Sequence, residues 1–178
     1  MRIISGKLGG RRFTPPAHMP HTRPTTDVAK EGLFNILQNR IDFDGLNCLD
    51  LFGGTGSISY ELISRGASQV IIVEKDHKQV QFIQQTSVQL NIDSIKIVKQ
   101  DVFHYLDNCQ EQFDFIFAGP PYALTSIDLI PSIIFSKRML ANGGLFVLEH
   151  TPRNSYTSYQ GFERERNYGT TVFSFFVS

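Results

Sequence analysis

Short apolar runs alternate with amphipathic segments from residue 46 onward. The apolar runs are LNCLDLF, QVIIVE, IKIVKQ, FDFIFA and GLFVLE, each of strand length and apolar on both faces. The segments between them predict helices near 56–66, 76–91, 102–108 and 126–136. Doubly apolar strands separated by helices are typical of a parallel sheet covered on both sides. The predicted fold class is therefore α/β.

The C-terminal segment breaks this alternation. GFERERNYGTTVFSFFVS contains two strand-like runs joined at Tyr168-Gly169-Thr170, and no helix fits between them. Strands joined so closely must be antiparallel. A mostly parallel sheet that ends in an antiparallel hairpin resembles the arrangement of Rossmann-like methyltransferases.

The N-terminal region differs from the rest in charge. Residues 1–40 carry seven Lys or Arg against two acidic side chains, and the other 138 residues carry ten against fifteen. The net charge of zero is thus the sum of +5 in residues 1–40 and −5 in the rest of the chain. A basic arm on a mildly acidic body is the pattern of a polyanion-binding appendage, although a solvated charged tail would show it too.

Turn and proline signals organise this region. RIIS and RRFT flank GKLGG, whose glycines permit the positive φ of a hairpin turn. Four prolines between Pro15 and Thr25 predict a stiff connector. Thr25, Thr26 or Asp27 is then expected to cap a helix with one apolar face. We predict a basic arm at 1–24 and a second domain at 25–178. The apolar positions of the expected helix are Val28, Leu33, Phe34, Ile36 and Leu37.

Length and composition narrow the possible classes. A chain of 178 residues with 41% hydrophobic residues can bury one sizeable core and is short for two. The chain has no run of eighteen apolar residues and no apolar N-terminal stretch, so we expect a cytoplasmic protein. Cys48 and Cys109 form no CxxC motif or Cys/His cluster, so we expect unpaired thiols and no metal site.

A glycine-rich loop, DLFGGTGS, follows the first strand at residues 50–57. Glycines let the backbone turn sharply and let a ligand approach it, while the next helix presents unpaired amides. The loop lacks the last glycine of GxGxxG and begins with an acid. That acid suits a ligand with an amino group better than a pyrophosphate, which favours S-adenosylmethionine over a nicotinamide dinucleotide. The cofactor-binding residues expected here are Asp50, Phe52, Gly53, Gly54 and Gly56.

Acids also close the next two strands. Glu74 ends the second strand and Asp101 the third, at the sheet edge where doubly wound folds bind ligands. Glu74 would accept hydrogen bonds from both ribose hydroxyls, and Asp101 would lie near the adenine amino group. Either acid could instead be a helix N-cap. Lys75 and Val102 complete the predicted cofactor set.

The fourth strand, FDFIFA, ends in a stiff corner at Gly119-Pro120-Pro121-Tyr122. The two prolines fix φ near −65° and bias Gly119 away from the α conformation, so a carbonyl is held with little freedom. Tyr122 can stack on a planar base. A rigid carbonyl beside an aromatic face suits methylation of an exocyclic base amine. We predict that these four residues are catalytic; a proline turn with a surface tyrosine is the alternative.

These motifs carry a resemblance to a known family. GPPY resembles the Asp/Asn/Ser-Pro-Pro-Tyr motif of amino-methyltransferases, and most of the chain resembles the bacterial 16S rRNA guanine-N2 methyltransferases of the RsmD type. RIISGKLGGRRF is similar to that family's opening hairpin, RPTTDVAKEGLFNIL to its linker and first helix, DLFGGTGSISYELISRGA to its cofactor loop, and IIVEKD to its ribose-binding strand end.

The resemblance implies a class I S-adenosylmethionine-dependent fold with a seven-stranded sheet and methyl transfer to the N2 amine of one guanine. The implied substrate is 16S rRNA, either alone or in a small-subunit assembly particle, and the expected enzyme is a monomer that needs no metal. Thr25 and Thr26 would line the path between RNA and cofactor. Phosphate contacts are expected from Lys7, Arg11, Arg12 and Arg23.

Gly119 departs from the family pattern, which has Asp, Asn or Ser at this position. Glycine cannot accept a hydrogen bond from the guanine amine, and losing one positioned polar group can slow a reaction by roughly 10²-fold. The chain could be an enzyme that relies on backbone and stacking, an RNA-binding protein weakened in catalysis, or a chain with an introduced substitution. An NAD-dependent oxidoreductase is a further alternative.

Overall fold

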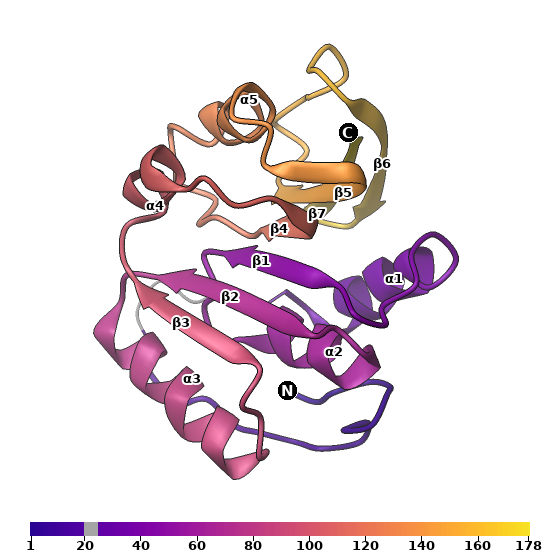
Figure 1. Cartoon of the computed structure of the whole chain (residues 1–178). Coiled ribbons are helices and arrows are strands. Elements are labelled where there is room, and N and C mark those ends of the chain that lie inside the picture. The colour runs from indigo at the N-terminus through magenta and orange to yellow at the C-terminus, as the bar shows by residue number, and fades with distance from the viewer. Residues whose placement is uncertain (20–24) are drawn as a thin grey trace.

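A computed structural model describes residues 1–19 and 25–178. A sheet forms its centre, with helices on both faces (Figure 1). The strands are β1 (Asn47–Leu51), β2 (Gln69–Glu74), β3 (Ile95–Lys99), β4 (Phe113–Ala118), β5 (Leu140–His150), β6 (Phe162–Tyr168) and β7 (Thr171–Val177). The helices are α1 (Asp27–Leu37), α2 (Ser57–Arg65), α3 (His77–Gln89), α4 (Val102–Asn108) and α5 (Leu129–Ser136).

The sheet has seven strands in the order β3-β2-β1-β4-β5-β7-β6. The first five strands of the chain pair in parallel, whereas β7 is antiparallel to both β5 and β6. The predicted α/β class, parallel sheet and C-terminal hairpin are confirmed. Because the chain runs outward from β1 to β3 and then returns to β4, the strand order reverses between β1 and β4. Such a reversal opens a ligand crevice at the carboxyl ends of the two strands.

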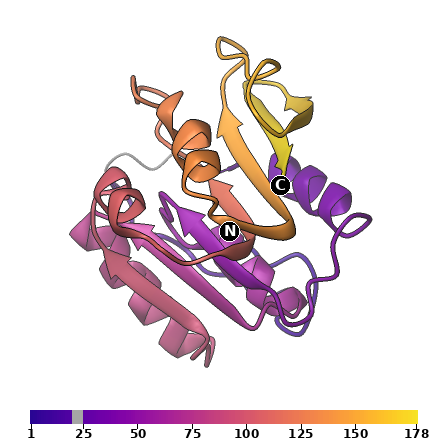
Figure 2. The same ribbon diagram turned by 45° about the horizontal axis from the view of Figure 1, so that its top comes forward.

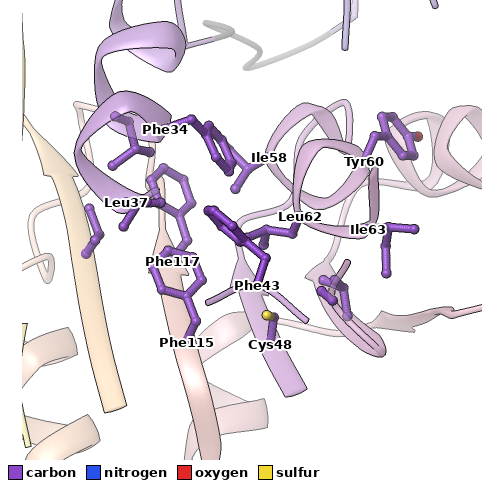
Figure 3. Packing of buried hydrophobic residues seen from close by; sticks show 14 of the residues in the cluster. Phe34, Leu37, Phe43, Cys48, Ile58, Tyr60, Leu62, Ile63, Phe115 and Phe117 are labelled. Atoms are coloured by element: carbon purple, nitrogen blue, oxygen red, sulfur yellow. The ribbon is translucent and has the colours of Figure 1, made fainter. Parts of the chain in front are cut away.

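Two apolar layers cover the sheet. One joins α1, α2 and α3 to one face, and the other joins α4 and α5 to the opposite face (Figures 1 and 2). In the first layer, Phe34 of α1 and Ile58 of α2 point toward Phe117 of β4 (Figure 3). Strands buried on both faces explain the continuous apolar runs of the sequence.

Most element bounds agree with the sequence pattern to within a few residues. β2, β4 and α4 begin and end where they were predicted. The helix predicted from residue 126 begins at Leu129, because residues 125–128 form turns. β5 begins at Leu140, before its predicted start at 144. Val28 of α1 was expected on the apolar face but is 73% exposed, because the buried stripe runs through Ala29, Leu33 and Leu37.

The N-terminal segment forms the predicted hairpin in minimal form. The backbone N–H of Ile3 donates to the Arg11 carbonyl at 2.9 Å, and Arg2 and Arg12 form a single antiparallel bridge. Ile3 and Phe13 are buried in the same apolar layer as α1 and α2. The hairpin is therefore packed on the body. The predicted boundary at residue 24 lies outside the described residues and stays a prediction.

A buried charge network fastens the hairpin. The Glu61 carboxylate of α2 accepts from the backbone N–H groups of Ile4 and Ser5 at 2.8 and 3.0 Å. Lys30 of α1 donates to the Arg2 carbonyl at 2.6 Å, and its Nζ lies 3.5 Å from Glu61. Both charged side chains are at most 1% exposed. Lys30, one of the basic residues counted above, is therefore buried and adds nothing to the basic surface.

Candidate active site

The glycine loop and the proline corner meet at the carboxyl ends of two adjacent strands. β1 and β4 pair in parallel with Leu51 opposite Ala118. The Gly119 N–H donates directly to the Leu51 carbonyl at 3.2 Å, which joins the two bends. A cleft of about 500 Å³ lies over them, within the usual volume of small-molecule sites.

Nearly all predicted catalytic and cofactor residues line this cleft. Gly56 is the exception, and Thr25 is the predicted RNA residue that joins the lining. Glu149 also lines the cleft, and the sequence reasoning missed it. It is the last residue but one of β5, whereas Glu74 is the last residue of β2, so a search for acids near strand ends would have found it. Besides Glu149, the lining includes these predicted residues: Asp50, Phe52, Gly53, Gly54, Glu74, Lys75, Asp101, Val102, Gly119, Pro120, Pro121, Tyr122 and Thr25.

The glycine loop depends on close packing and unusual backbone angles. A Cβ on Gly53 would lie 2.1 Å from Cγ2 of Ile72, so only glycine fits there. Gly56, with φ of 80°, is the N-cap of α2 and shapes the loop from outside the cleft. Phe52 is also left-handed, with φ of 62°, a strained conformation for a bulky residue. The fold therefore imposes this loop geometry, as is common at ligand sites.

Asp50 is a buried acid beneath the loop. It is 2% exposed, and its Oδ2 accepts a hydrogen bond from the Ser59 hydroxyl at 2.6 Å. Burial raises the pKa of the Asp50 carboxyl to about 7, the Ser59 hydrogen bond opposes that rise, and the negative charge of Glu74 adds to it. A cationic group bound nearby would favour the ionised form.

The carboxylates of Glu74 and Asp101 both accept hydrogen bonds from backbone N–H groups. Glu74 accepts from the N–H of Gly54 at 2.9 Å and from the N–H of Asp76 at 2.9 Å, so it ties the glycine loop to β2. A carboxylate has about four acceptor positions and can accept from ligand hydroxyls as well. Asp101 accepts from the N–H of Phe103 at 2.9 Å and is the N-cap of α4. The N-cap role considered from the sequence is therefore observed for Asp101.

Hydrogen bonds hold the aromatic ring of the proline corner. The Tyr122 hydroxyl donates to Oε1 of Glu149 at 3.1 Å and lies 2.9 Å from the Thr171 hydroxyl. The Thr25 hydroxyl donates to Oε2 of the same Glu149 at 2.6 Å. Tyr122 is therefore not a loose surface side chain. Glu149, which is 5% exposed, links the corner to the segment before α1.

Among the predicted RNA-contacting residues that the structure describes, Thr25 lines the cleft and Lys7, Arg11, Arg12 and Thr26 do not. Lys7, Arg11 and Arg12 are exposed on the N-terminal hairpin. Thr26 accepts from the Ala29 N–H at 3.2 Å as the N-cap of α1. The remaining predicted contact, Arg23, lies outside the described residues.

Within residues 1–19 and 25–178, no three His, Cys, Asp or Glu side chains gather closely enough to hold a metal ion. Nor does any helix in these ranges combine the length and apolar character needed to cross a membrane. Cys48 and Cys109 are buried free thiols.

Comparisons with known proteins agree with this geometry. The family described as Conserved hypothetical protein 95 matches residues 1–177. YlbH of Bacillus subtilis, which has a provisional rRNA methyltransferase name, is 32% identical over 96% of this chain and 95% of its own. Ribosomal RNA small subunit methyltransferase D of Escherichia coli is 28% identical over 86% of this chain and 76% of its own.

A solved structure has the same fold. The Thermus thermophilus 16S rRNA N2 G1207 methyltransferase RsmC, in complex with AdoMet and guanosine, superposes with a TM-score of 0.70 over 88% of this chain and 44% of its own. At 23% sequence identity, this likeness concerns the fold alone. The match over nearly the whole sequence decides the family. The chain belongs to the Conserved hypothetical protein 95 family, and the RsmD-type resemblance found in its motifs is confirmed.

Proposed function

We propose that the protein is an S-adenosylmethionine-dependent methyltransferase that modifies the exocyclic N2 amine of a guanine in 16S rRNA. The observation that carries the proposal is the direct hydrogen bond from the Gly119 N–H to the Leu51 carbonyl. It brings the corner suited to a base amine beside the loop suited to a methyl donor, in one cleft. The name of the Escherichia coli relative supports methyl transfer to the RNA of the small ribosomal subunit.

The residues at the glycine loop fit the proposed cofactor. Gly53 keeps the loop free of a Cβ that the neighbouring strand could not accommodate, so the backbone can approach a ligand. Buried Asp50 would be paired by the cofactor's amino group, and Glu74 can accept from its ribose hydroxyls. When bound, S-adenosylmethionine supplies an electrophilic methyl group. Membership of a methyltransferase family removes the support for the NAD-dependent alternative.

The role of the protein side chains is mainly positioning. The carbonyl of Pro120 would orient the guanine amine, and Tyr122, held by Glu149 and Thr171, would stack on the base. Reactants held in a near-attack geometry recover roughly 7 to 11 kcal/mol of a bimolecular barrier. The amine proton can leave after transfer, so no strong base is required.

The exposed basic side chains of the hairpin would bind RNA phosphates. Lys7, Arg11 and Arg12 lie on a segment fixed to α1 and α2, so their charges have a defined position relative to the cleft. Phosphate neutralisation releases counterions and makes affinity fall steeply with salt. RNA affinity that did not change between low and high salt would contradict this role.

The test is labelled-methyl transfer from S-adenosylmethionine to small-subunit particles that lack base methylation. We expect label in N2-methylguanosine after digestion of the 16S rRNA. Fully methylated particles are the matched control and should accept no label. Label in another nucleoside, or tight cofactor binding without any transfer, would contradict the proposal.

One observation favours a second candidate, an RNA-binding protein weakened in catalysis. Gly119 lacks the side chain that the family motif offers to the amine. A Cβ at this position would lie 3.0 Å from Cε1 of Phe117, which must yield by a few tenths of an ångström to admit Gly119→Asp. Activity in the Gly119→Asp variant but not in the natural sequence would support this candidate. Activity in the natural sequence would reject it.

A further inference from the structure

We propose that Glu149 reads the Watson–Crick edge of the target guanine and takes over the part that an acid at position 119 would play. The inference rests on the proposed function. Guanine presents two adjacent donors, N1–H and the N2 amine, whereas adenine and cytosine place an acceptor beside their amine. A carboxylate has two oxygens that can each accept, so it matches guanine alone among these bases.

The position of Glu149 carries the first step. It lies one residue before the end of β5, next to Leu148, which is opposite Ala118 at the end of β4. A Cβ built on Gly119 would lie 3.7 Å from Oε2 of Glu149, so this carboxylate lies beside the space that a side chain at 119 would enter. Glu149 also lines the cleft together with Gly119, Pro120 and Tyr122.

The partners of Glu149 carry the second step. Its oxygens accept from the hydroxyls of Tyr122 and Thr25, at 3.1 and 2.6 Å, which fixes the carboxylate beside the ring proposed to stack on the base. Glu149 can accept from guanine while it keeps these two hydrogen bonds, because each carboxylate oxygen can accept more than one hydrogen bond. Because Glu149 is 5% exposed, water competes little for its hydrogen bonds. A base that places an acceptor against this carboxylate would therefore bind more weakly than guanine.

The charge of Glu149 suits the transfer itself. As the bond from N2 to the methyl carbon forms, the bond from sulfur to that carbon breaks and its electron pair stays on sulfur. The positive charge therefore passes to N2, which then loses one proton to water. A negative carboxylate beside N2 stabilises this charge when it develops.

The experiment compares guanine with 2-aminopurine at the target position of small-subunit particles. 2-Aminopurine keeps the N2 amine but has an acceptor at N1, which faces a carboxylate unfavourably. Glu149→Gln replaces one acceptor by a donor and so matches 2-aminopurine. We expect the natural protein to prefer guanine by at least about tenfold in kcat/KM, and Glu149→Gln to lose or reverse this preference.

Matched variants separate recognition from positioning. Thr25→Val with Tyr122→Phe removes the two hydroxyls described above but keeps the Glu149 carboxylate, so the preference for guanine should persist at a lower rate. Glu149→Asp keeps two acceptor oxygens and should also keep the preference, which tests the proposal even if Glu149→Gln fails to fold. Melting temperature and cofactor affinity are measured for every variant to identify any loss of fold.

The outcomes distinguish this inference from the proposed function. If the natural protein methylates guanine and Glu149→Gln lowers both rates equally, the recognition role of Glu149 is overturned and the proposed function stands. A guanine preference lost in Glu149→Asp would also overturn it. If the natural protein methylates no guanine in the particles, the proposed function fails, and this inference fails with it.

Discussion

The buried carboxyl of Asp50 makes the ligand-free protein sensitive to pH in a way that one substitution should remove. Its pKa is raised to about 7 by burial, against an ordinary value near 4. The folded state therefore binds a proton more tightly than the unfolded state. This contribution to stability is fully present below pH 4 and is lost as pH rises through 7.

The magnitude follows from the pKa difference. Above pH 5 the unfolded carboxyl is ionised while the folded one stays protonated until the pH nears 7, so stability falls by up to about 1.4 kcal/mol per pH unit. The loss between pH 5 and pH 8 is roughly 3 kcal/mol, which corresponds to roughly 5 to 10 °C in melting temperature for a chain of this size. Asp50→Asn has no such titration but can still accept from the Ser59 hydroxyl.

Urea denaturation of both proteins between pH 5 and pH 8, without cofactor, measures this difference. Groups that titrate alike in the two proteins cancel, so the unfolding free energy of Asp50→Asn should rise relative to the natural protein by roughly 3 kcal/mol between pH 5 and pH 8. S-adenosylmethionine should bind the natural protein more tightly as pH rises from 6 to 7.5, and Asp50→Asn should bind it weakly throughout. A stability difference independent of pH would refute the reasoning.

Three further predictions concern the loop, the hairpin and its anchor. Gly53→Ala should abolish cofactor binding in calorimetry, because its Cβ would overlap a neighbouring isoleucine; unchanged affinity would contradict the tight loop. Arg11→Ala with Arg12→Ala should lower the slope of log affinity for RNA against log salt by about 1.4 to 1.8, and an unchanged slope would remove them from the interface. Lys30→Met should cost about 3 to 5 kcal/mol in urea denaturation, because it leaves Glu61 with one cation fewer. A loss below 1 kcal/mol would mean that the network adds little.

The sequence predicts the order of strands and helices because doubly buried strands and amphipathic helices leave distinct hydrophobic patterns. The position of the cleft follows from topology, since a loop after β1 and a corner after β4 must lie at the same sheet edge. Glu149 was missed although it lies one residue before the end of β5, close to the strand-end position that identified Glu74. Its signal was weak because no glycine loop or double-proline corner follows this acid in the sequence.

Other features could not be predicted because they depend on contacts between distant segments. Lys30 counts as a surface charge in the sequence, and only the packing of the hairpin against α1 and α2 buries it beside Glu61. The left-handed backbone of Phe52 is likewise imposed by the fold, since local preference disfavours it. Charge counts along a sequence therefore overstate the basic surface of the N-terminal region.

A crystal structure of the protein with S-adenosylhomocysteine and guanosine tests the shared cleft most directly. We predict the cofactor product between the glycine loop and Glu74, and the guanine stacked on Tyr122 with its N2 amine directed toward the sulfur. The N1–H and N2 donors should face Glu149. Guanosine bound away from Tyr122, or the cofactor product bound outside the loop of residues 50–57, would contradict the common site.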